Sequence, residues 1–349
     1  MMQARHFFCF RRPWRSLVCV TGILVIGRAL LSSAAAAPTN STDLVWPPPP
    51  EPPRIRFVEN LARPTDFGFK QSALRRFSNW LFGSQKGDVP FQAPFAIALD
   101  ESGNLALTDM AFATVGCYER KEKKWYQWQE IGGVRFRSPV GVAKHGRTIF
   151  VADSELGVVL AFDLKARLQF IIDAPLKRPV GLCVTGDHLC VADPGLQAVC
   201  VFNLKGEFLF QFGRKGVGPG EFNYPTHVAA DAAGKLYVTD ALNGRIQVFD
   251  EQGKFQNTIG VLGDGLGCLS RPKGVAVNQL GHVYVADGLK DSLQIYSTQN
   301  QFLLVLGGSG ANAGQFCMPS GVAAGTNCLV YVADSGNHRI QVFQYIGSP

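Results

Sequence analysis

The sequence predicts an all-β fold in which six four-stranded sheets stand in a ring. The first observation is a repeat: a unit of 40 to 47 residues recurs six times between about residue 93 and residue 343. The second is that each unit holds four short runs rich in β-branched and aromatic residues, separated by Gly, Asn and Asp turns. One such sheet cannot bury both of its faces, whereas a closed ring of them can. This repeat length with four strands per unit is typical of a β-propeller, so we predict six antiparallel blades.

The repeats define the blade boundaries. Every unit begins with a proline and a strand-like run, which places the blade starts near residues 93, 138, 178, 224, 271 and 318 of a propeller spanning 93–349. A second strand-like run ends in an aspartate in all six units, at Asp109, Asp153, Asp193, Asp240, Asp287 and Asp334. Six identical active sites in one ring are implausible. We therefore interpret these aspartates as structural, accepting hydrogen bonds from turn amides or pairing with a nearby arginine.

Residues 1–37 carry the three parts of an export signal. Basic residues without an acid occupy positions 1–15, the apolar run Leu17–Ile26 follows, and the small residues of SSAAAAP complete the segment. We expect export to the periplasm or the cell exterior after cleavage near Ala37. The alternative is an uncleaved membrane anchor, but the apolar run is short for a bilayer span and Arg28 interrupts it, so no stable transmembrane anchor is expected.

Three segments separate the signal from the first repeat. Residues 38–53 contain WPPPPEPP, and because proline lacks an amide donor we expect a stiff linker there. Residues 54–61, RIRFVENL, are strand-like, and since the last repeat has no obvious fourth strand we expect them to supply it and close the ring. Residues 62–92 are predicted to be a connector with one short helix, because Leu74, Phe77 and Leu81 fall at helical spacing.

Charge and cysteine content narrow the function. The chain has 34 basic and 27 acidic residues, and removal of the signal with its five arginines leaves 29 against 27, a net charge of only +2. We therefore expect no nucleic-acid partner. Seven of the nine cysteines lie outside the signal, and there is no CxxC motif. Cys183 and Cys190 flank one hairpin turn, so they are either a cross-strand disulfide or two buried free thiols.

The repeats resemble NHL repeats. The resemblance is carried by YPTHVAADAAGKLYVTDALNGRIQVFD and MPSGVAAGTNCLVYVADSGNHRIQVF, and by the glycine-rich connectors FGRKGVGPGEFNYP and LGGSGANAGQFCMP. With the signal and the proline run, the chain resembles exported bacterial NHL-repeat propellers that carry a Pro-rich N-terminal stalk. For most proteins of this kind no reaction is assigned, so the resemblance implies a non-catalytic platform for a protein partner or another ligand.

The alternative is a metal-dependent hydrolase or lyase with its site in the central channel. In the amidating lyases, which carry NHL-like repeats, a histidine follows the blade-start proline in several blades and the imidazoles converge on zinc. Here those positions hold Phe95, Val140, Val180, Thr226, Lys273 and Ser320. His227 stands one residue late and alone. We therefore predict no catalytic residue, no metal ligand and no cofactor, and favour a protein that is not an enzyme.

The candidate binding face is the end of the ring that carries the blade-start prolines. Its positions in blades one to three are apolar, and those in blades four to six are polar or basic. The candidate residues are Phe95, Phe112, Val140, Leu156, Thr226, His227, Lys273 and Lys290. An apolar patch with a polar border predicts a protein contact, whose partner and oligomeric state the residues leave open. The alternative is that the helix expected before residue 82 covers the apolar half.

Overall fold

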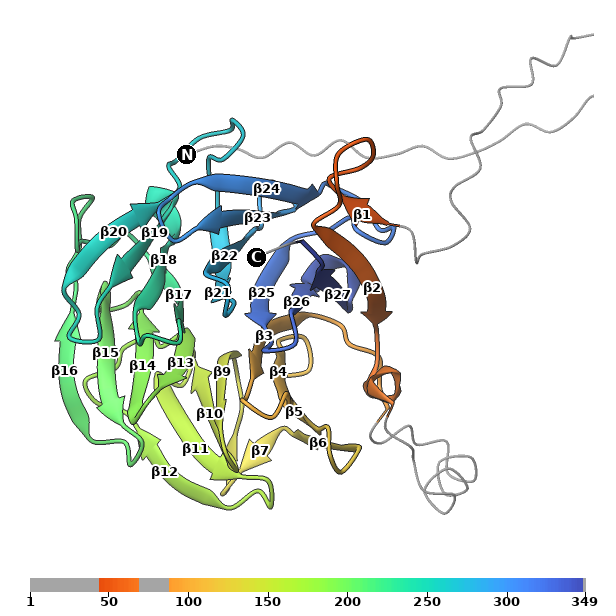
Figure 1. Ribbon diagram of the computed structural model, residues 1–349. Helices are drawn as coiled ribbons and strands as arrows, with labels where there is room; N and C mark the ends of the chain where they lie inside the picture. The colour runs from red at the N-terminus through yellow and green to blue at the C-terminus, as the bar shows by residue number, and fades with distance from the viewer. Residues whose placement is uncertain (1–43, 69–87, 348–349) are drawn as a thin grey trace, which may run out of the picture. The chain divides into compact units, whose positions relative to one another are not determined.

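Six antiparallel sheets follow one another around a ring in the computed structural model (Figure 1). The structure describes residues 44–68 and 88–347, which belong to one unit, Asn40–Pro349. In this part of the chain the predicted all-β, six-bladed propeller with four antiparallel strands per blade is confirmed. The predicted signal, residues 1–37, lies outside the described residues, as do Leu74, Phe77 and Leu81 of the predicted helix. Just before them, η2 (Pro64–Phe67) forms a single 3-10 turn.

Blades one to five each use four consecutive strands. Blade one has β3 (Pro94–Leu99), β4 (Leu105–Asp109), β5 (Thr114–Glu119) and β6 (Lys124–Trp128). Blade two has β9 (Pro139–His145), β10 (Thr148–Asp153), β11 (Val158–Asp163) and β12 (Leu168–Ile172), after a small hairpin of β7 (Glu130–Ile131) and β8 (Val134–Arg135). Blade three has β13 (Gly181–Thr185), β14 (His188–Asp193), β15 (Ala198–Asn203) and β16 (Phe208–Phe212). Blade four has β17 (Pro225–Ala230), β18 (Leu236–Asp240), β19 (Arg245–Phe249) and β20 (Phe255–Ile259). Blade five has β21 (Pro272–Val277), β22 (His282–Asp287), β23 (Ser292–Ser297) and β24 (Phe302–Gly307).

Blade six joins the two ends of the described chain. β25 (Pro319–Ala324), β26 (Leu329–Asp334) and β27 (Arg339–Tyr345) come from the C-terminal repeat. β2 (Ile55–Leu61) pairs antiparallel with β27, from Ile55 opposite Tyr345 to Leu61 opposite Ile340. A fifth strand, β1 (Val45–Trp46), pairs with β2 at the outer edge. Alternation along β2 buries Ile55, Phe57 and Leu61, as expected for a strand with one face on the core.

The proline run differs from the stiff linker expected over 38–53. Trp46, immediately before the run, lies in β1 and its ring contacts Phe343 edge-on, with 5.8 Å between centroids. Residues 47–54 then form the connection between β1 and β2. Prolines suit this connection because it makes no ladder hydrogen bonds that would need their missing amides. The end of the linker is therefore part of blade six.

Close approach of the innermost strands holds the ring together. Each first strand contacts the first strand of the next blade, and β25 returns to contact β3. In blades two, three, five and six a glycine two residues after the blade-start proline permits this approach: a Cβ on Gly141 would lie 1.9 Å from the carbonyl oxygen of Val180 in the next blade. Likewise a Cβ on Gly321 would lie 2.3 Å from the Phe95 carbonyl oxygen. Apolar clusters fill the space between adjacent blades.

Candidate functional site

A cavity of about 350 Å³ opens at one end of the ring. This end, which we call the proline face, is where the first strands begin and the second strands end. Three apolar residues, Phe95, Val140 and Val180, form what we call the apolar wall. Thr226 and His227 at the start of β17 line the cavity as well. Three basic residues also line the cavity, and we call them the cation group: Arg178, Arg271 and Lys273.

The cavity brings together five of the eight residues predicted for the binding face. Phe95, Val140, Thr226, His227 and Lys273 line it. The other three, Phe112, Leu156 and Lys290, are not part of its lining. The Lys290 ammonium instead donates hydrogen bonds of 2.9 Å to the carbonyl oxygens of Gly265 and Cys268, so it anchors a connector.

The expected apolar half of the face needs correction. Val140 and Val180 are buried in the cavity wall, and of the apolar candidates in blades one to three only Phe112 is among the exposed large side chains. The most exposed apolar side chains belong to connectors next to blades four and five, where Leu266 is 83% exposed and Leu289 66%. Strand alternation directs the two valines inward, whereas these two leucines lie outside the strands.

Phe95 and His227 meet across the ring although they come from blades one and four. Their ring centroids lie 6.0 Å apart with an interplanar angle of 37°. Both side chains line the cavity on the proline face, and neither lines the narrower channel further along the first strands. The two rings therefore belong to the cavity, and their contact joins blades one and four across the ring.

His227 and Thr226 are polar groups without hydrogen-bond partners. Both ring nitrogens of His227 and the Thr226 Oγ1 are buried and make no hydrogen bond, although each residue as a whole is only half-buried. Burial, with a smaller contribution from the charge of Lys273, lowers the pKa of His227 to about 4. The imidazole is therefore neutral at pH 7 and offers one donor and one acceptor.

The structural aspartates position two members of the cation group, Arg178 and Arg271. Asp193 accepts hydrogen bonds from the backbone amides of Lys177 and Arg178, at 2.7 and 3.0 Å. Asp287 does the same for Ser270 and Arg271, at 2.7 and 3.1 Å. Each aspartate ends the second strand of its blade and binds the residues just before the first strand of the same blade, so it fixes the backbone from which those side chains reach the cavity. Asp240 and Asp334 likewise accept a backbone amide, from Asn223 and Cys317, and in addition hold Arg245 and Arg339, each with its Nε at 2.8 Å.

The sequence prediction did not include Arg178 and Arg271, because it used the residues after each blade-start proline and after each second-strand aspartate. The residue before the proline also faces the cavity in four blades, as Ser138, Arg178, Tyr224 and Arg271. The signal was present in the repeat starts RPVG and RPKG. Because the first strand of a blade begins at the proline, the residue before the proline lies at the rim of the ring.

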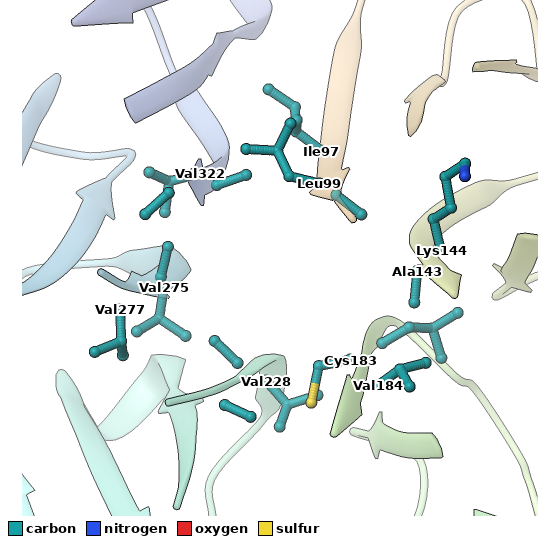
Figure 2. A pocket seen from close by; sticks show the side chains of 17 residues that line it. Ile97, Leu99, Ala143, Lys144, Cys183, Val184, Val228, Val275, Val277 and Val322 are labelled. Carbon is teal, nitrogen blue, oxygen red and sulfur yellow. The ribbon is translucent and has the colours of Figure 1, made fainter. Parts of the chain in front are cut away.

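Small aliphatic side chains surround the central channel (Figure 2). A part of the channel with a volume of about 180 Å³ is lined by residues such as Ile97, Val228 and Val275. Lys144 is the one charged residue in this lining, and its amine points away from the middle of the ring (Figure 2). The amine donates to Asp100 at 2.6 Å and lies 3.2 Å from Glu119, so two carboxylates of blade one neutralise this lysine of blade two.

Cys183 and Cys190 lie directly opposite each other on β13 and β14, and both are free thiols. Cys183 also lines the channel (Figure 2).

Across residues 44–68 and 88–347, no group of three or more His, Cys, Asp or Glu side chains is placed to hold a metal ion. No helix in these ranges is both long and apolar enough to cross a membrane.

Family models match parts of the chain. Residues 316–343 match the NHL repeat, and residues 167–234 and 229–307 match a family described as a 6-bladed beta-propeller. No curated protein matches the sequence. The fold and the cavity thus define a six-bladed β-propeller that contains an NHL repeat and has a ligand-sized cavity at one end of its channel.

Solved structures share the fold at low sequence identity. A streptogramin B lyase is 11% identical with a TM-score of 0.54, over 74% of this chain and 95% of that chain. Hydrazine synthase from Kuenenia stuttgartiensis is 13% identical with a TM-score of 0.53, over 74% and 97%. A structural genomics protein of unknown function from Bacteroides thetaiotaomicron is 14% identical with a TM-score of 0.55, over 73% and 70%. At such identities the likeness shows the fold alone.

Proposed function

We infer that the protein is an exported propeller that binds a ligand, without transforming it, in the cavity on its proline face. One observation carries this inference: the cavity places polar groups without partners beside an apolar wall, at the mouth of a channel otherwise lined by aliphatic residues. Binding sites combine apolar walls with a few convergent polar groups in this way. Export is supported by the signal-like residues 1–37 and by the proline run that follows.

A small-molecule screen against residues 38–349 tests the function. Ser154→Trp places an indole in the cavity lining, whereas Phe112→Trp enlarges a residue on the same face outside that lining. We expect ligands that shift the melting temperature of the wild type and the Phe112 variant but not of the Ser154 variant. Circular dichroism of each variant checks folding. If the ligands shift the melting temperature of the Ser154→Trp variant as much as that of the wild type, this cavity is not their binding site.

The channel enzyme remains the alternative, and two measurements separate it from a binder. Mass spectrometry of each bound ligand after prolonged incubation should show it unchanged. Elemental analysis of the purified protein should show no stoichiometric zinc or calcium. Conversion of a ligand, or one equivalent of metal, would favour a hydrolase or lyase.

A protein partner on the proline face is a second candidate, favoured by the exposed leucines around the connectors of blades four and five. Leu262 and Leu266 are 58% and 83% exposed, and Leu262 lies over the β18–β19 turn at Gly244. In affinity capture, the double variant Leu262→Asp/Leu266→Asp should no longer bind the partner. The control variant Leu280→Asp should still bind it, because Leu280 lies in the turn between β21 and β22 at the opposite end of the ring.

A further inference from the structure

The cavity lining is rich in hydrogen-bond donors and contains no acidic residue. The cation group supplies three positive charges, and an arginine or lysine side chain donates hydrogen bonds but accepts none. No ion pair found within residues 44–68 and 88–347 includes Arg178, Arg271 or Lys273. Like charges that share a concave surface without a counter-ion create a positive potential that attracts anions.

Lys273 is the most enclosed of the three cations. It is half-buried, while Arg178 and Arg271 are exposed at the rim. Asp291 is the acid whose charge reaches Lys273, but its carboxylate accepts hydrogen bonds from the Ser309 hydroxyl at 2.6 Å and the Met318 amide at 2.7 Å. These donors are uncharged, so Asp291 keeps its negative charge and acts on Lys273 from a distance, but no ion pair found in the described residues joins the two.

The unpaired Thr226 hydroxyl and His227 imidazole point to the same chemistry. Buried polar groups in folded proteins nearly always have a partner, because desolvation without one is costly. The hydroxyl and the neutral imidazole can each donate a hydrogen bond, in addition to the donors of the cation group. A ligand that satisfies this lining must be rich in acceptors and negatively charged.

We propose that the cavity binds a small organic oxyanion, a carboxylate or phosphate carried on an apolar group. The charged head lies against the cation group, and the apolar part packs on the apolar wall. This inference rests on the proposed binding function and adds the chemical class of the ligand. Charge-assisted hydrogen bonds make the charged head the main source of affinity. The apolar wall selects the apolar group that carries the head.

Titration calorimetry with matched probes tests the class. The anions are 3-phenylpropionate and phenyl phosphate, and the controls are 3-phenylpropanol and 3-phenylpropylamine, which keep the ring but lack the negative charge. At least one anion should bind about tenfold or more tightly than either control. The anion that binds more tightly shows whether the cavity prefers a carboxylate or a phosphate head.

Two variants locate the binding. Lys273→Met should weaken the anion about tenfold or more, whereas Lys254→Met should not, because Lys254 lies exposed in the β19–β20 turn at the opposite end of the ring. Equal binding of anions and controls, no binding of either anion, or anion binding unaffected by Lys273→Met, would overturn the oxyanion assignment. The binding function itself would survive each of these results if the small-molecule screen still yields ligands that Ser154→Trp excludes.

Discussion

Single residues decide how each blade turn is built. Asp334 and Asp240 are buried and occupy equivalent positions, and each accepts hydrogen bonds from an arginine, an asparagine and a glutamine side chain. The following turn needs a left-handed residue, which is Gly244 in blade four and His338 at φ 58° in blade six. The run DSGNHR, which resembles a catalytic cluster in isolation, is therefore a turn whose histidine occupies a glycine position.

His227 should make the stability of the protein depend on pH. Its pKa is lowered to about 4 by burial and by Lys273, whereas the unfolded chain binds the proton near pH 6.5. Between these values the unfolded state holds more protons, so stability must fall as pH falls from about 6.5 to 4.

His227→Gln should remove this part of the pH dependence. Between pH 7 and pH 4 the wild type should lose about 3 kcal/mol more than the variant in the free energy of unfolding, since one pKa unit corresponds to about 1.4 kcal/mol. Urea denaturation at both pH values measures the difference, and His145→Gln, at the exposed end of β9, is the control. Parallel losses in wild type and His227→Gln would show that the imidazole titrates normally.

At the scale of elements, blade six depends on a strand from the other end of the chain. Phe57 of β2 is buried and its ring lies 5.8 Å from that of Phe343 in β27. The sequence indicated a strand over 54–61 because the last repeat lacks a fourth run. β1 gave no comparable signal, because two residues before a proline run are too short to show alternation.

Phe57→Ala should destabilise the whole ring, since the contact it removes joins the first described strands to the last. Loss of a buried phenylalanine costs about 3–5 kcal/mol. Asn60→Ala on the exposed face of the same strand is the matched control. Thermal melts should show one cooperative transition that shifts down for Phe57→Ala and for deletion of residues 54–61, but little for Asn60→Ala. An unchanged melt after the deletion would contradict a closing role for β2.

At the scale of the whole molecule, repeat counting predicts the architecture but not the contacts across the ring. Pro94 and Pro225 mark the starts of blades one and four. Nothing local in the sequence shows that the side chains of Phe95 and His227 contact each other across the ring. The same holds for Lys144, which looks like an ordinary exposed lysine before a hairpin turn. Local patterns report which face of a strand is buried. Closure of the ring brings together residues more than 100 positions apart, and that geometry decides which polar groups meet.

Lys144 joins blades one and two through an ion cluster that the whole ring encloses. Its side chain is fully buried, and its amine bonds Asp100 at 2.6 Å and lies 3.2 Å from Glu119. Burial alone would raise the pKa of Asp100, but hydrogen bonds from Lys144 and Asn104 outweigh it and hold the pKa below its ordinary value. The carboxylate therefore contributes stability above pH 4 that is lost as pH falls through its lowered pKa.

Lys144→Met should leave two enclosed carboxylates without their cation and cost about 3–5 kcal/mol at pH 7, whereas Lys121→Met in the exposed β5–β6 turn should cost little. Adding Asp100→Asn and Glu119→Gln to Lys144→Met should restore part of the loss, because the penalty comes from unpaired charge. The gap between wild type and Lys144→Met should narrow below pH 4 as the carboxylates gain protons. Denaturant titrations of these variants at pH 7 and pH 3.5 measure both effects. If the triple variant is no more stable than Lys144→Met, then the lysine acts by filling space between the blades rather than by balancing charge.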